Sequence, residues 1–100
     1  MIRDTEAIEH PGQHVTVEGV VVAVFTSNNG NTFLSFGAAY PNHTFGGWIL
    51  PDSELARIST RASLSGLAGR KLRITGTIEF YKGVPVIRVS STRQIQEDAD

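Results

Sequence analysis

The side chains that most often catalyse reactions or hold metals are present, but their spacing suits neither task. His10 and His14 are four residues apart, yet the Pro-Gly pair between them breaks the helix that would align both imidazoles. His43 is isolated, and no serine sits in a nucleophile-elbow pattern. The glycines at 65–69 lack the strand context and the lysine of a phosphate-binding loop. We therefore expect no enzyme activity, no metal and no cofactor.

Length and composition indicate one small folded domain. Its 100 residues are 40% hydrophobic and 19% charged, which predicts one domain spanning 1–100 with a core at roughly 13–95. There is no cysteine, so a disulfide framework or a thiol nucleophile is excluded. No apolar run could span a membrane, and residues 1–12 do not resemble a signal peptide. We expect no membrane partner; the cytoplasm is favoured, with export left open.

Charge is distributed unevenly along the chain despite a net charge of −1. Residues 1–60 carry two basic and six acidic side chains, whereas residues 61–93 carry seven basic ones against Glu79 alone. This asymmetry is compatible with a local basic face for a polyanion. It is equally compatible with solvent-facing strand residues that discourage edge pairing.

Five segments have the alternation or β-branched content of strands. They are 15–25, 32–37, 44–50, 71–80 and 84–89. Gly19 in the first segment predicts a bulge or bend, and the apolar run at 20–24 predicts burial on both faces. The residues at 27–31 and the Lys82-Gly83 pair predict turns.

Two helices complete the predicted order. Residues 4–9 form a short helix capped by Asp4 or Thr5, and a second helix follows Pro51 and ends near Gly66 or Gly69. The order is then three strands, one helix and two strands. This order predicts an all-β fold, a five-stranded Greek-key barrel of the oligonucleotide/oligosaccharide-binding (OB) type with the helix between strands three and four.

Four stretches also resemble a known family, the bacterial OB-fold domains of the nucleic-acid-binding superfamily. They are GQHVTVEGVV (12–21), GNTFLSFG (30–37), YPN (40–42) and GRKLRITGTI (69–78), and the similarity extends over roughly residues 7–95. The resemblance implies the barrel and, by analogy, nucleic-acid binding. The chain departs from the pattern at Gly46-Gly47-Trp48, where bulkier β-branched residues are expected.

Ligands of this fold lie across the outer face of strands two and three, beside the adjoining loops. Phe33 and Trp48 fall on that face, and stacking of a base on such a ring contributes about 1–3 kcal/mol. Arg88 on strand five is expected beside Trp48, where it would meet a phosphate or the indole. The expected nucleic-acid-binding set is Phe33, Ser35, Trp48, Arg88, Tyr40, Asn28, Asn29, Asn31, Tyr81 and Lys82.

The same features leave three interpretations open. The first is a non-catalytic module for single-stranded DNA or RNA with low sequence preference. The second is a protein-interaction, interdomain or homodimer surface, and the third is plain packing of Phe33 and Trp48 beneath Tyr40 in the loop at 38–43. A one-residue slip of the third strand would bury Trp48 and remove half of the case for binding.

Overall fold

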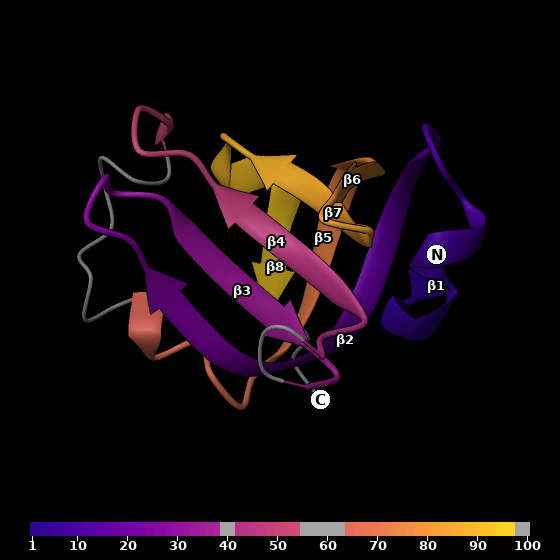
Figure 1. Ribbon diagram of the computed structural model, residues 1–100, viewed down its shortest axis with the longest axis horizontal. Helices are drawn as coiled ribbons and strands as arrows, with labels where there is room; N and C mark the ends of the chain where they lie inside the picture. Colours follow the sequence, from indigo (N-terminus) through magenta and orange to yellow (C-terminus); the bar gives the residue numbers. More distant parts are fainter. Residues whose placement is uncertain (39–41, 55–63, 98–100) are drawn as a thin grey trace.

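The computed structural model describes residues 1–38, 42–54 and 64–97, and strands are the dominant element (Figure 1). The described strands join into a single twisted sheet. The predicted all-β class is confirmed. The helix predicted after Pro51 falls mainly on 55–63, outside the described residues, as does Tyr40.

Eight strands make up this sheet within the described part of the chain. They are β1 (Ile2–Arg3), β2 (His14–Thr26), β3 (Thr32–Phe36), β4 (Phe45–Ile49), β5 (Lys71–Thr77), β6 (Glu79–Tyr81), β7 (Val84–Val89) and β8 (Ile95–Glu97). Their order is β6-β7-β4-β3-β2-β5-β8, with β1 beside the first half of β2. The β4–β7 pair is parallel, so the predicted third and fifth strands are neighbours.

The described residues form eight strands where the sequence predicts five. The predicted fourth strand divides at Ile78, whose backbone N–H donates to Gln13 and whose carbonyl accepts from Gly12. Ile78 thus separates β5 from β6. The two further strands, β1 and β8, are two and three residues long, too short to show a period in the sequence. β8 follows the 3-10 turn η2 (Thr92–Gln94) and pairs with β5.

The long strand β2 serves two neighbours, pairing with β5 through its first half and with β3 through its second. The register shifts between Val21 and Ala23, two residues beyond the glycine that predicted a bend. The predicted burial of 20–24 on both faces is wrong, because Val20 is 46% and Val22 45% exposed. The bulge changes which residues face the core: Val21 is buried before it, and Val24 packs on the core after it.

The core lies along the inner faces of these strands. Its largest fully buried side chains are Phe36, Phe45, Leu34, Ile49, Leu72, Ile74, Ile78 and Ile87. Gly47 belongs to this inner face, since a Cβ there would lie 2.8 Å from Cδ1 of Ile74. The alternation of Leu72, Ile74 and Ile78 predicts that Phe80 points inward as well. Phe80 is instead 45% exposed, because it lies beyond the break, opposite Pro85 in the β6–β7 hairpin.

The short helix predicted at 4–9 is present as the 3-10 helix η1 (Asp4–Glu9). Its cap begins one residue earlier than predicted, since the Arg3 backbone N–H donates to the Glu6 carboxylate at 2.9 Å. Together with β1 it lies at one side of the sheet, beside β2 (Figure 1). No helix in the ranges described is both long enough and apolar enough to cross a membrane.

Candidate aromatic binding surface

Strand register aligns one row of side chains on the outer face of the sheet. Phe25 on β2 pairs with Phe33 on β3, Phe33 pairs with Trp48 on β4, and Trp48 pairs with Arg88 on β7. Neighbouring strands lie about 4.8 Å apart, so the row spans about 14 Å across the strands. We call Phe25, Phe33, Trp48 and Tyr81 the aromatic surface.

Three rings of this surface contact one another. Phe33 and Trp48 lie 5.8 Å apart between centroids with their planes 22° apart. Tyr81, on β6, reaches across to both, with centroids 6.1 Å from Phe33 and 5.9 Å from Trp48. Phe33 and Trp48 are consequently half-buried, while Tyr81 stays 38% exposed. The outward direction that the sequence predicts for Phe33 and Trp48 is therefore found, although Tyr81 covers part of both rings.

Polar contacts fix the two ends of this cluster. The Trp48 indole N–H donates to Oδ1 of Asn31 at 3.0 Å, which holds the ring in one orientation. The Arg88 guanidinium carbon lies 5.5 Å from the Trp48 ring centroid, and Nη2 of Arg88 donates to Glu79 at 2.8 Å. The Lys82 ammonium lies 5.4 Å from the Tyr81 ring centroid. Aromatic faces with cations beside them are suited to flat, electron-rich or anionic ligands.

A groove of about 600 Å³ runs beside the cluster, between the exposed edge of Phe25 and the hairpin that carries Tyr81. Its walls are Ala23, Phe25, Ser27, Phe33, Leu34, Ser35, His43, Gly46, Tyr81 and Lys82. This volume lies within the range of sites that hold small organic ligands. The groove is mostly apolar, with hydroxyl groups, one imidazole and one ammonium as polar groups.

Gly46 and His43 shape one end of the groove. A Cβ on Gly46 would lie 3.1 Å from Cγ1 of Val86, so a larger residue would crowd the outer face. Burial lowers the pKa of His43 below its ordinary value, because desolvation disfavours the imidazolium. His43 is therefore neutral at pH 7 and presents one donor and one acceptor nitrogen.

Not every predicted site residue joins this surface. Ser35 lines the groove but is buried, and Asn28 and Asn29 are exposed in the turn between β2 and β3. Asn31 is the asparagine of that turn that bonds an aromatic ring of the surface. Tyr40 lies outside the described residues.

Three contributors were absent from the predicted set: Phe25, His43 and Glu79. Phe25 is 62% exposed and forms one wall of the groove. It closes an apolar run that predicts burial on both faces, and the bulge that turns it outward depends on pairing with β3. In the sequence, the one indication of this role was that the apolar run at 20–24 is followed by an aromatic residue, Phe25.

Four basic residues of the segment at 61–93, within the part that the structure describes, form ion pairs. Arg70 pairs with Glu97, Lys71 and Arg73 both pair with Glu18, and Arg88 pairs with Glu79. These pairs are at least partly exposed, so each contributes little to stability. An anion that approached these cations would have to compete with the paired carboxylates.

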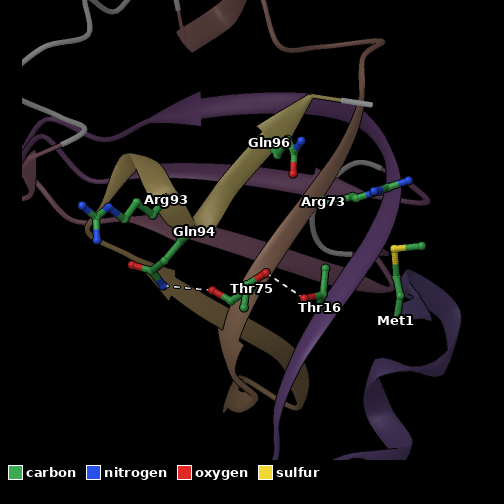
Figure 2. A pocket seen from close by; sticks show the side chains of 7 residues that line it. All are labelled: Met1, Thr16, Arg73, Thr75, Arg93, Gln94 and Gln96. Carbon is green, nitrogen blue, oxygen red and sulfur yellow. Dashed lines mark hydrogen bonds between the residues drawn. The ribbon is translucent and has the colours of Figure 1, made fainter. Parts of the chain in front are cut away.

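A second, polar groove of about 390 Å³ lies over β2, β5 and β8 (Figure 2). In this groove the Thr16 and Thr75 hydroxyls bond at 2.8 Å, and the Gln94 amide donates to the Thr75 carbonyl at 3.1 Å. Arg73 and Arg93 extend toward opposite sides of the groove in Figure 2, with Arg73 directed to Glu18 on β2. The two cations therefore do not converge on one point where an anion would be held.

No protein-family model matches the chain, and no curated protein matches it significantly. A function has to follow from the chemistry of the aromatic surface.

Proposed function

We propose that this protein is a non-catalytic module that binds single-stranded DNA or RNA with little sequence preference. The observation that carries the proposal is the row of Phe25, Phe33, Trp48 and Arg88, aligned on one outer face by strand pairing. Every base has a π-face, so stacking on rings accepts any sequence. A row that crosses the strands suits an extended strand of nucleotides lying at right angles to β3 and β4.

The proposal includes closure of the sheet into a five-stranded OB-type barrel with Greek-key order. In this interpretation β5 and β6 act as one strand interrupted at Ile78, so that β6, paired with β7, links the two ends of the sheet. The close approach of Gly76 on β5 to Ile87 on β7 supports it, since a Cβ at Gly76 would lie 2.5 Å from Cγ2 of Ile87. A contact between Gly76 on β5 and Ile87 on β7, measured by nuclear magnetic resonance, tests the closure, and its absence would contradict it.

Stacking, more than charge, is the expected source of affinity. Lys82 and Arg88 are the cations beside the rings, and Glu79 partly neutralises Arg88. For single strands each phosphate contact contributes about −0.7 to the slope of log K against log salt. One or two contacts then predict a shallow slope of about −0.7 to −1.4.

The test is a titration of a labelled oligothymidylate by fluorescence anisotropy, with the emission of Trp48 recorded in parallel at low salt. Binding with a change in Trp48 emission supports the proposal. Absence of binding up to high micromolar oligonucleotide would contradict it. A nucleic acid with an uncharged backbone should still bind through its bases, but more weakly, because the phosphate contacts are lost.

The competing function is a protein-interaction surface. The observation in its favour is that Phe33 stacks on Trp48 and on Tyr81, while Trp48 and Tyr81 are tilted against each other. The three rings thus form one continuous apolar patch of the kind that binds protein partners. Light scattering at several concentrations separates its self-associating form from the nucleic-acid proposal. A monomer at all concentrations, or a dimer that forms only when oligonucleotide is present, favours nucleic acid. A dimer that oligonucleotide cannot dissociate favours the protein surface.

A further inference from the structure

The turn that joins β6 to β7 has an unfavourable residue at its tip. Tyr81 pairs with Val84, so Lys82 and Gly83 form a two-residue hairpin loop. Both have positive φ, 52° at Lys82 and 83° at Gly83, which is the pattern of a type I′ turn. Asparagine, aspartate or glycine normally occupies the first position, because other side chains crowd the left-handed backbone. Among the described residues, Lys82 is the one non-glycine residue with positive φ.

The position gives this lysine a place at the groove. Lys82 is exposed, lines the groove, and holds its ammonium 5.4 Å from the centre of the Tyr81 ring. Tyr81 in turn stacks on Phe33. The residue that the turn disfavours is therefore the one that brings a positive charge to the mouth of the aromatic groove. Backbone strain of this kind is concentrated at binding sites, where the surroundings hold it in place.

Arg88, the other cation of the surface, is held at a different ring. Its guanidinium lies over Trp48 and donates to Glu79 at 2.8 Å. The Lys82 ammonium lies over Tyr81. The two cations therefore lie against different rings of the cluster, and it is Lys82 that lines the groove.

We propose that Lys82 binds a phosphate of the nucleotide whose base occupies the groove, and that the strained turn is kept for this contact. The inference rests on the proposed function and adds to it where the backbone of the ligand passes: the phosphate lies at the tip of the β6–β7 hairpin and the base lies between Phe25 and Tyr81. The ligand is therefore expected to place its negative charge at one end of the groove, beside the β6–β7 hairpin.

The experiment compares Lys82→Asn with Lys82→Arg in the whole chain, measuring thermal unfolding and oligothymidylate binding from 20 mM to about 200 mM salt. Asparagine suits the type I′ turn, so K82N should raise the unfolding temperature by about 3 °C. It should weaken binding about fivefold at low salt and make the salt slope shallower by about 0.7 to 1. K82R should keep the affinity and the slope of the parent protein.

Each result decides a different point. If K82N binds oligothymidylate as tightly as the parent protein, the phosphate contact is wrong while the nucleic-acid function stands. If K82N gains no thermal stability, Lys82 does not destabilise the turn, and the inference is likewise overturned. If the parent protein binds no oligonucleotide, or binds a glutamate-rich peptide more tightly, the proposed function fails and this inference fails with it.

Discussion

Arg88 lies over Trp48 across the parallel pair of β4 and β7, with 5.5 Å between the guanidinium carbon and the ring centroid. The two residues are 40 positions apart in the chain, and register alone brings them opposite each other. The same guanidinium bonds Glu79 on β6. Arg88 thus connects three strands: a change in its ion pair with Glu79 would also change its contact with the Trp48 ring.

Replacing Trp48 by alanine should weaken oligonucleotide binding by tenfold or more, since a base–ring stack contributes about 1–3 kcal/mol. Anisotropy of a labelled oligothymidylate measures this without the tryptophan signal. Trp48→Phe keeps a flat ring and should recover most of the affinity. Equal weakening by the alanine and phenylalanine variants would indicate that the indole acts through its bond to Asn31 and not through stacking.

Phe25→Ala should reduce affinity several-fold with little change in stability, because this ring is 62% exposed and forms a wall of the groove. Phe80→Ala is the matched control, since Phe80 is an exposed phenylalanine that lies opposite Pro85 and outside the groove lining. Binding and thermal unfolding are measured for both variants. Loss of affinity in the Phe80 variant alone would move the site to another face of the sheet.

Glu79→Gln should strengthen nucleic-acid binding about two- to fivefold and steepen the salt slope by about 0.7, because Arg88 then meets phosphate without a competing carboxylate. The lost ion pair is exposed, so stability should fall by only about 0.2–1 kcal/mol. Glu97→Gln removes the equivalent partner of Arg70 elsewhere on the sheet and serves as the control. An unchanged affinity in the Glu79 variant would mean that Arg88 contacts no phosphate.

His43 should make the fold less stable at acid pH. Burial lowers the folded-state pKa of His43 below its ordinary value, so in the window beneath that value the unfolded chain binds a proton that the folded chain refuses. Stability is then full above the ordinary pKa and declines as the pH falls toward the folded-state pKa. Unfolding temperatures at pH 7.5 and 5.5 should differ less in His43→Gln than in the parent protein, and an equal difference in both would contradict a role of His43.

Gly76→Ala should destabilise the fold by about 1–3 kcal/mol through overpacking, since its Cβ would lie 2.5 Å from the branched side chain of Ile87. Urea unfolding gives the free energy, and Thr77→Ala, at the exposed neighbouring position, provides the comparison. A neutral Gly76 variant would mean that β5 and β7 can separate at this point, and would weaken the proposed barrel closure.

The chain's local patterns were sufficient to predict where most strands lie. Leu72, Ile74 and Gly76 alternate with polar residues and face inward as that alternation requires. The turn at 27–31 and the hairpin at 82–83 were predicted from Gly30 and Gly83, which accept a positive φ. Strand count was predicted less well, because the break at Ile78 is made by hydrogen bonds to Gln13 and Gly12, 65 and more positions away.

The aromatic surface, too, was predicted in part from the sequence and decided in part by the tertiary structure. Residue types in the sequence were enough to select Phe33 and Trp48, because strand period sets the face on which a side chain points. Only the tertiary structure decided that Phe25 turns outward after a bulge, that Tyr81 crosses from β6 to cover both rings, and that Arg88 is held by Glu79. Period two is a local property of the backbone, whereas cross-strand register, ring contacts and ion pairs depend on which distant segments the fold brings side by side.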